Sequence, residues 1–300
     1  MLKRIMRILR TLGSIATKPQ QLSIRKAFPD GHFYSPILDA TLLEKEVERI
    51  WPVNPEVNGI DFNENEQLRW ITEILPQHLP FFDYPETVNQ HDAADTFYQG
   101  NTQFGGLDAR MLFTFLRETS PRRLIEVGSG FSSLLTADVN HRFLDGRMDF
   151  TCIEPYPRDF LRNSVPGISR LLELRVQDVP LETFDVLDEG DVLFIDSSHV
   201  VKTGSDVNYL FLQVLPRLKS GVVIHIHDIF LPQDYPKKWV LGEGRGWSEQ
   251  YLVHALLMYS SGFKILFGSA YCQIRLRSEM MQALNGRHWG GGSLWLRKVH

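Results

Sequence analysis

The stretch Val192-Leu193-Phe194-Ile195 decides the fold of this 300-residue chain. Four consecutive apolar residues, followed at once by Asp196, are typical of a strand in the middle of a parallel sheet that helices cover on both faces. Working outward from it, strand-like and helix-like segments alternate from Pro121 to the C-terminus. This alternation predicts an α/β fold of the doubly wound kind.

Seven strands are expected in the sheet, this central one included. The sequence places them at residues 123–127, 149–154, 171–176, 191–196, 222–227, 263–269 and 294–299. Between them, it predicts helices at residues 132–141, 158–163, 181–187, 205–218 and 248–260, of which the helix over 205–218 has the clearest apolar stripe. Ligands of such sheets lie beyond the carboxyl ends of the strands, so those ends are the places to search for a site.

The N-terminal third has a different organisation. Residues 1–29 form a basic amphipathic segment, and residues 30–107, interrupted by many prolines, predict an N-terminal helical cap lobe of short helices. A further helix, which we expect Asp108 to cap, begins the main α/β domain at residues 108–300.

The charge of the first segment has two interpretations. Residues 1–29 carry seven Lys and Arg and no acid, whereas the rest of the chain carries 25 basic and 36 acidic side chains. Apolar residues at helical spacing within residues 1–12 favour peripheral contact with an anionic membrane. A basic helix packed on the protein's own body or on a second subunit, as in a homo-oligomer, explains the same pattern.

Composition excludes several classes of protein. A net charge of −4 and a pI near 6.2 argue against nucleic acid as a partner. Two cysteines are too few for a disulfide framework, and the sequence shows neither an apolar run of membrane-spanning length nor a signal peptide. These features predict a cytoplasmic protein.

The first predicted strand of the α/β domain ends in a glycine turn, Ile125-Glu126-Val127-Gly128-Ser129-Gly130-Phe131-Ser132-Ser133. Gly128 and Gly130, with Ser129 between them, allow the backbone to approach a ligand at a helix N-terminus. A dinucleotide fingerprint would have a third glycine at position 133 and no acid at position 126. Glu126 suits a ligand that bears an ammonium group better than it suits a pyrophosphate.

Acidic residues follow the next two strands as well. Glu154 ends the second strand, 26 residues after Gly128, and an acid at that place can accept hydrogen bonds from ribose hydroxyls. Asp178 follows the third strand, where its carboxylate can take the amino group of an adenine. Three acids on successive strand ends favour a nucleoside-containing ligand.

The fourth and fifth strands end in proton-transfer groups. Asp196 and His199 follow the fourth strand, and His227 and Asp228 follow the fifth. Such residues exchange protons and also supply oxygen and nitrogen ligands to divalent metals. For His225, two positions before the end of the fifth strand, a structural role is expected.

These strand ends together resemble the class I S-adenosylmethionine-dependent methyltransferases, in particular a bacterial group with a Gly31-to-Pro36 lead-in that is often found among polysaccharide and natural-product genes. The resemblance extends from about Gly31 to Asp228. It implies a Rossmann-like, doubly wound seven-stranded sheet whose last strand, at residues 294–299, runs antiparallel. It also implies S-adenosylmethionine as the cofactor of residues 108–300, with cofactor-binding residues Glu126, Gly128, Ser129, Gly130, Glu154, Asp178 and Asp196.

The activity expected from this resemblance is methylation of a hydroxyl on a small-molecule or sugar-like, glycan-like acceptor. His199 and His227 are the candidate bases, with Asp196 and Asp228 as orienting groups. A divalent metal on Asp196, His227 and Asp228 stays open, because the related metal-dependent enzymes have a different pair where this chain has His227-Asp228. Arg245 and Trp247, in a glycine-rich loop, are candidates for contact with the acceptor.

Two other functions remain as alternatives at this point. One is a nicotinamide-dependent oxidoreductase on the same fold, which Glu126 and Ser133 disfavour. The other is a non-catalytic nucleotide-binding partner in a biosynthetic complex, an interpretation motivated by the basic N-terminus.

Overall fold

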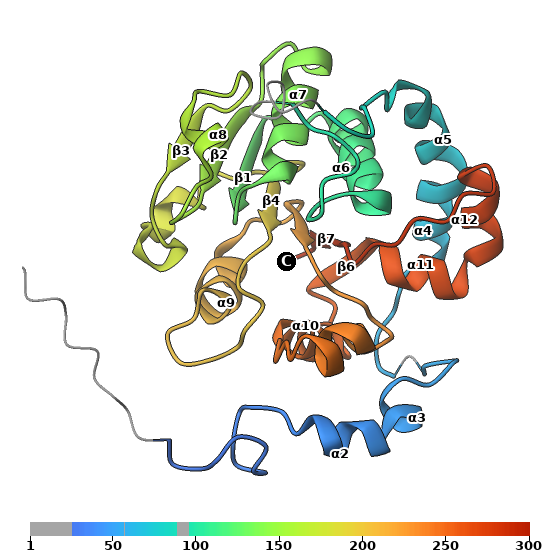
Figure 1. Ribbon diagram of the computed structural model, residues 1–300. Coiled ribbons are helices and arrows are strands. Elements are labelled where there is room, and N and C mark those ends of the chain that lie inside the picture. The colour runs from blue at the N-terminus through green and yellow to red at the C-terminus, as the bar shows by residue number, and fades with distance from the viewer. Residues whose placement is uncertain (1–25, 57, 89–95) are drawn as a thin grey trace, which may run out of the picture. The chain divides into compact units, whose positions relative to one another are not determined.

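Seven strands form one sheet in the order β3-β2-β1-β4-β5-β7-β6 (Figure 1). The computed structural model describes residues 26–56, 58–88 and 96–300. The strands are β1 (Arg123–Val127), β2 (Asp149–Ile153), β3 (Arg170–Leu172), β4 (Val192–Ile195), β5 (Val223–Ile226), β6 (Phe263–Gly268) and β7 (Leu294–Lys298). All four residues of β4 are buried, as the predicted central position requires.

The direction of the last strand agrees with the expected fold. Strands β1 to β5 pair in parallel, whereas β7 lies antiparallel between β5 and β6. The Rossmann-like, doubly wound sheet with an antiparallel last strand is therefore confirmed.

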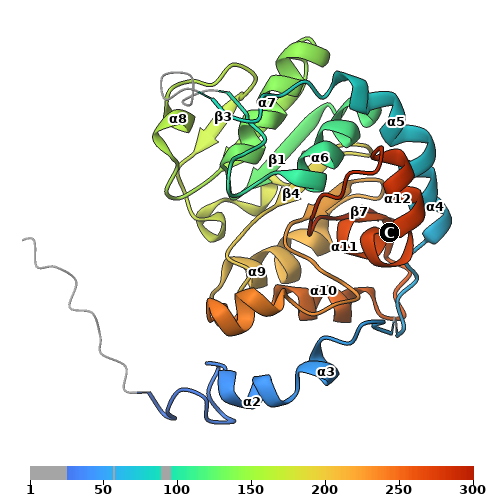
Figure 2. The same ribbon diagram turned by 45° about the vertical axis from the view of Figure 1, so that its right-hand side comes forward.

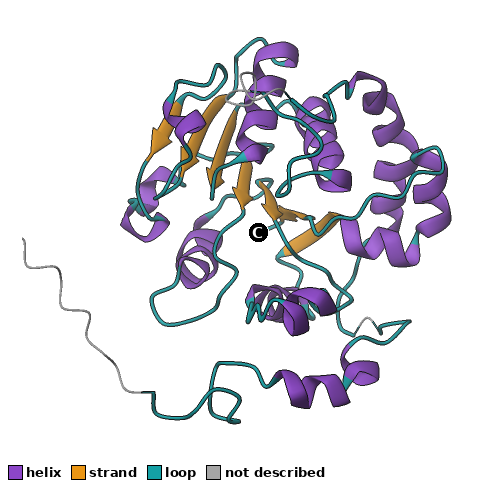
Figure 3. Cartoon of the chain, in the orientation of Figure 1, coloured by secondary structure: helices purple, strands orange, loops and turns teal. Residues whose placement is uncertain are grey.

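Helices cover both faces of this sheet. Figures 1 and 2 show α6 (Gly106–Thr119) and α7 (Phe131–Phe143) on one side, with α9 (Asp206–Tyr209) and α10 (Glu249–Leu257) on the other. The other helices, like these four, are purple in Figure 3. They are α2 (Ala40–Lys45), α3 (Val47–Ile50), α4 (Glu64–Arg69), α5 (Leu75–His78), α8 (Asp159–Arg162), α11 (Ser269–Arg275) and α12 (Arg277–Ala283).

Turns of other helix types extend several of these elements. They are η1 (Trp70–Ile74), η2 (Leu79–Phe81), η3 (Val176–Asp178), η4 (Leu181–Thr183), η5 (Leu210–Val214), η6 (Leu215–Arg217) and η7 (Lys238–Gly242). The predicted helix over 205–218 is thus the continuous run of α9, η5 and η6.

Two predicted elements differ from the structure. The helix expected over 181–187 is η4 and a turn, because Leu181, Phe184 and Leu187 recur every three residues and the backbone forms bonds from Phe184 N to Leu181 O and from Leu187 N to Phe184 O. The strand expected over 171–176 ends at Leu172, and Val176 instead starts η3.

The continuous run of α4, η1 and α5 shares the core of the sheet domain. Trp70 of η1 stacks on Phe115 of α6 with ring centroids 3.7 Å apart, and Phe115 stacks on Trp295 of β7 at 4.0 Å. Residues 40–300 form one compact unit and the segment before residue 40 forms another. The boundary predicted between residues 107 and 108 stays a prediction.

The N-terminal predictions fall largely outside this description. Residues 1–12, for which membrane contact is expected, and most of the basic segment over 1–29 lie outside the described residues. Within the part of the chain that is described, no helix has the length and apolar character needed to cross a bilayer.

Candidate active site

The glycine turn after β1 is held tightly against the end of β4. Gly128 has a φ of +81°, and a Cβ atom there would lie 1.7 Å from the carbonyl oxygen of Asp196. Only glycine fits this position. Gly130, in contrast, has open space beside it, with no heavy atom within 4 Å of the place that a Cβ would occupy.

Glu126 braces this turn from inside the protein. Its side chain is buried, Ser132 Oγ donates to Glu126 Oε1 at 2.7 Å, and Ser133 Oγ donates to Glu126 Oε2. Ser133 Oγ in turn accepts a hydrogen bond from Gly130 N at 2.9 Å. Burial raises the pKa of Glu126 to about 7, against the hydrogen bonds from Ser133 and Ser132. Glu126 thus supports the turn, and it lines neither of the cavities described next.

The first cavity has a volume of about 520 Å³ and lies above the carboxyl ends of β1, β2 and β4. Gly128, Glu154, Tyr156, Gln177 and Asp196 are among the residues that line it. The Glu154 carboxylate accepts hydrogen bonds from Ser129 N at 3.2 Å and Tyr156 N at 2.8 Å. These two bonds fix the orientation of the carboxylate at the cavity wall.

Asp178 lies elsewhere. Its carboxylate is exposed and forms two 2.8 Å hydrogen bonds with Arg175, which lower its pKa. The neighbouring Gln177 lines the first cavity in its place.

The second cavity, of about 500 Å³, adjoins the first at Asp196, which lines both. It brings together all six residues predicted to carry chemistry or bind an acceptor: Asp196, His199, His227, Asp228, Arg245 and Trp247. The other lining residues, among them Asp108, Phe230 and Trp239, were not predicted for this site from the sequence.

His199 sits among three carboxylates. Its Nδ1 lies 2.8 Å from Glu249 Oε2, and its Nε2 lies 3.3 Å from Asp196 Oδ1 and 3.7 Å from Asp228 Oδ2. Burial opposes a charge on this ring, but the hydrogen bonds to Asp196 and Glu249 outweigh it and raise the pKa of His199 to about 10. Carboxylates thus face both ring nitrogens of His199, an arrangement that favours its protonated form and disfavours it as a general base.

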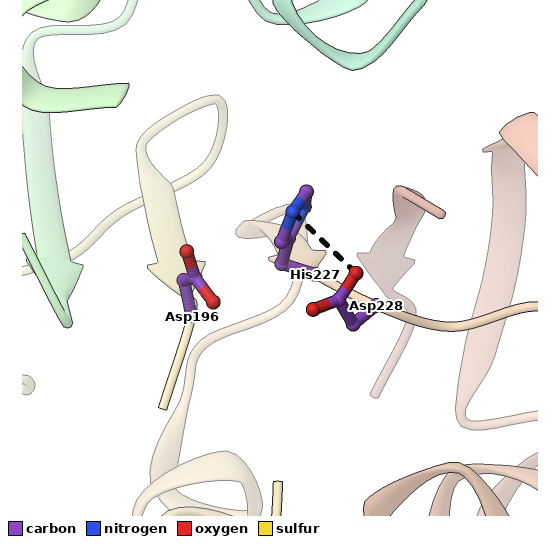
Figure 4. A group of neighbouring side chains, drawn as sticks. All are labelled: Asp196, His227 and Asp228. Carbon is purple, nitrogen blue, oxygen red and sulfur yellow. Dashed lines mark ion pairs between the residues drawn. The ribbon is translucent and has the colours of Figure 1, made fainter. Parts of the chain in front are cut away.

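His227 and Asp228 face Asp196 across the second cavity (Figure 4). His227 Nε2 lies 3.7 Å from Asp228 Oδ1, and the buried Nδ1 of His227 has no hydrogen-bond partner among the described residues. Burial opposes a positive charge on His227, but the charges of Asp196 and Asp228 outweigh burial and raise the pKa of His227. For Asp228, burial is the largest effect and raises the pKa of its carboxyl.

These same three residues form a group that can hold a metal ion. One ligand atom from each of Asp196, His227 and Asp228 lies within 4.8 Å of the others. Two carboxylates and an imidazole with an unpartnered nitrogen fit a divalent cation. His199, which already contacts both carboxylates, competes for them.

His225 has the structural role expected for it. Its ring is buried, stacks on Phe194 with centroids 3.9 Å apart, and bonds Ser293 Oγ through Nε2 at 2.8 Å. Burial lowers its pKa well below the ordinary value.

The predicted acceptor-contact residues lie side by side at the second cavity. The guanidinium carbon of Arg245 is 4.1 Å from the ring centroid of Trp239 and 4.7 Å from that of Trp247. Arg245 also pairs with Glu243 at 2.7 Å. Two indole rings and a guanidinium thus form one wall of the cavity.

Asp108 corrects an expectation about α6. This helix begins at Gly106 with Gly105 as its N-cap, so Asp108 is not the cap. Its buried carboxylate instead accepts hydrogen bonds from Gly292 N at 2.8 Å, Ser293 N at 3.0 Å and Ser269 Oγ at 2.7 Å. It anchors the chain before β7 where that chain lines the second cavity.

Comparisons with known proteins agree with this geometry. Residues 125–229, from β1 to just beyond β5, match the protein family described as "Methyltransferase domain". A protein of Archaeoglobus fulgidus, itself uncharacterised, is 41% identical over 171 residues, which span 56% of this chain and 76% of the archaeal protein.

The solved structures in the comparison share little sequence with this chain. An O-methyltransferase from Bacillus cereus, in complex with SAH, is 11% identical with a TM-score of 0.37, covering 86% of this chain and 97% of its own. A SAM-dependent methyltransferase from Anabaena variabilis is 12% identical with a TM-score of 0.36, covering 82% and 97%.

The family match and the cavities at the strand ends define the class of protein: residues 125–229 belong to a methyltransferase domain. The chain belongs to the same family as the A. fulgidus protein.

Proposed function

We propose that this protein transfers a methyl group from S-adenosylmethionine to a hydroxyl oxygen of a sugar-like small molecule. One observation carries the proposal: two cavities of about 520 and 500 Å³ meet at Asp196, at the carboxyl ends of the central strands. A transfer between two bound molecules needs two such adjoining sites, each large enough for a small ligand.

The first cavity fits S-adenosylmethionine by its donors and acceptors. The backbone at Gly128 and Ser129 allows close approach, and the fixed Glu154 carboxylate retains lone pairs for ribose hydroxyls. When bound, S-adenosylmethionine supplies an electrophilic methyl group on a sulfonium ion. Glu126 supports this cradle from behind, so we assign it a positioning role in place of the predicted contact with the ligand.

The second cavity supplies the groups that recognise an acceptor. The rings of Phe230, Trp239 and Trp247 can pack against the CH faces of a sugar, and the carboxylates of Asp196 and Asp228 can accept hydrogen bonds from its hydroxyls. This mixture of rings and carboxylates favours a polyhydroxylated acceptor over a purely apolar one.

Removal of the hydroxyl proton can occur in two ways at this site. Without a metal, His227 is the group we assign as proton acceptor, since its Nδ1 has no hydrogen-bond partner among the described residues, whereas carboxylates face both ring nitrogens of His199. With a divalent metal, Asp196, His227 and Asp228 would hold it, and the ion would lower the pKa of the acceptor hydroxyl. A chelator separates the two, because it abolishes turnover only in the second case.

Calorimetric titration with S-adenosylmethionine and, separately, with NADH tests the cofactor. We expect saturable binding of the first and none of the second, while the reverse result would favour the oxidoreductase alternative. Formation of S-adenosylhomocysteine with sugar-type acceptors then tests transfer. Binding without turnover over a broad acceptor panel would favour the non-catalytic alternative.

Three sequence-based expectations accompany this proposal unchanged. They are the cytoplasmic location, association into homo-oligomers and contact of residues 1–12 with anionic membranes.

A further inference from the structure

A third cavity, of about 720 Å³, shares no lining residue with the first two. Leu79, Phe82, Leu284 and Trp289 give it apolar and aromatic walls. Its polar lining includes Gln99, Asn285 and His288, with two arginines, Arg110 and Arg287, against one acid, Glu86. The methyl-transfer site described above makes no use of this cavity.

Arg110 is the most unusual of these residues, because its charged side chain is only 6% exposed. Its guanidinium carbon lies 3.4 Å from the ring centroid of Trp289 and 4.7 Å from that of Phe82. Nη1 donates to Gly106 O at 2.7 Å, and Nη2 donates to Gln99 Oε1. A guanidinium carries five N–H groups, so most of them have no acceptor among the described residues.

No carboxylate of the described residues forms an ion pair with this charge, although Glu86 at the cavity wall favours it from a greater distance. Within residues 26–56, 58–88 and 96–300, neither Arg110 nor Arg287 has a carboxylate oxygen within 4.0 Å. Burial and the nearby Arg287 lower the pKa of Arg110 to about 10, which still leaves it charged at neutral pH. Buried charges in proteins are normally paired, so a buried, unpaired guanidinium at a cavity wall points to an anion from outside the chain.

We infer that the third cavity binds a small organic anion, with a phosphate or carboxylate group on Arg110 and Arg287 and an apolar or ring portion against Phe82 and Trp289. Arginine suits both oxyanions, since its planar fork of donors matches their geometry. The aromatic rings on either side of Arg110 hold its guanidinium in place, so little side-chain freedom is lost when an anion binds.

A purely structural role for Arg110 is the competing explanation. In that case the guanidinium serves only to join the start of α6 to the segment around Trp289, through its bond to Gly106 O and its stacking on the indole. Arg287 separates the two explanations, because it is exposed, lines the cavity and has no hydrogen bond from its side chain to the described residues.

Calorimetry on the full chain tests the inference with three probes: phenyl phosphate, benzoate and the uncharged benzyl alcohol. We expect at least one of the two anions to bind more tightly than benzyl alcohol. Both Arg287→Ala and Arg110→Met remove a charge-assisted hydrogen bond, so each should lower the affinity for that anion about tenfold or more. The affinity for benzyl alcohol should not change. The anion that binds more tightly shows whether the cavity prefers a phosphate or a carboxylate group.

Arg277→Ala is the matched control, since Arg277 is an exposed arginine of α12 outside the cavity lining. It should leave all three affinities unchanged. If Arg110→Met does not fold, as a melting curve would show, Arg287→Ala decides alone.

Two results would overturn the inference. One is that neither anion binds more tightly than benzyl alcohol. The other is that Arg277→Ala lowers the affinity for the anions as much as Arg287→Ala does. Failure here leaves the proposed methyl transfer intact, because none of these residues lines the first or second cavity.

Discussion

The substitution Glu126→Gln tests the electrostatics beneath the glycine turn. Glu126 is fully buried, and burial raises its pKa from the usual 4.5 to about 7. A carboxyl whose pKa is raised in the folded state stabilises the fold while it is protonated, at pH values below its unfolded pKa. That stabilisation is lost as the pH rises through the folded pKa. The loss therefore falls mainly between about pH 4.5 and pH 7.

The size of the effect follows from the shift. Each pKa unit corresponds to about 1.4 kcal/mol, so linkage over this interval predicts that the parent loses about 2.5 kcal/mol of unfolding free energy through Glu126 between about pH 5 and pH 8. Glutamine keeps the shape and does not titrate; its oxygen can accept from one of the two serines, and its amide NH2 can donate to the hydroxyl of the other.

Urea unfolding of parent and variant at several pH values measures this difference. Because all other titrating groups are common to the two proteins, their effects cancel in the comparison. We expect Glu126→Gln to gain stability relative to the parent as the pH rises. Parallel profiles for the two proteins would refute the raised pKa and the buried position from which it arises.

Four further predictions concern the cavities and the N-terminus. Gly128→Ala should unfold at a clearly lower temperature and lose S-adenosylmethionine binding, because its Cβ would overlap Asp196 O, whereas Gly130→Ala should melt close to the parent. Glu154→Ala should weaken that binding by about 1 to 3 kcal/mol in calorimetry, and Asp178→Asn should leave it unchanged, since only Glu154 lines the first cavity. The variants His199→Ala, His227→Ala and Asp228→Ala should all bind the cofactor, but the rate of methyl transfer should fall about 10²- to 10⁴-fold in at least one of them. Three fully active variants would exclude the second cavity as the acceptor site. Deleting residues 1–12 should abolish sedimentation with anionic vesicles and spare cofactor affinity, and a change of oligomeric mass instead would favour the packing explanation.

The sheet was predictable because its strands carry the signal locally. The uninterrupted Val192–Ile195 run predicted a strand buried on both faces, and the structure buries all four residues. Errors occurred where helix and strand signals are weak. Leu181, Phe184 and Leu187 are apolar at a spacing that consecutive tight turns satisfy as well as a helix does.

The site was predictable at the strand ends and unpredictable in its side-chain directions. Asp196, His199, His227 and Asp228 meet because parallel strands deliver them to one edge. Glu126 turns inward instead, because the hydroxyls of Ser132 and Ser133 in the first turn of α7 offer it hydrogen bonds. The two serines that follow the glycine turn are the sequence signal that could have predicted the inward direction of the Glu126 side chain.

The remaining site residues differ in how local their signal is. Arg175, three residues before Asp178, captures its carboxylate, which is a local signal that the sequence does contain. Trp239, Phe230 and Asp108 reach the second cavity from separate segments. No local pattern marks residues whose meeting depends on the tertiary fold.

A crystal structure of the protein with S-adenosylhomocysteine is the sharpest test of the proposal that two cavities share the transfer. We expect density in the first cavity, with the ribose at Glu154 and the sulfur directed toward Asp196, where the second cavity begins. A ligand bound elsewhere, or one whose sulfur points away from the second cavity, would contradict the proposal.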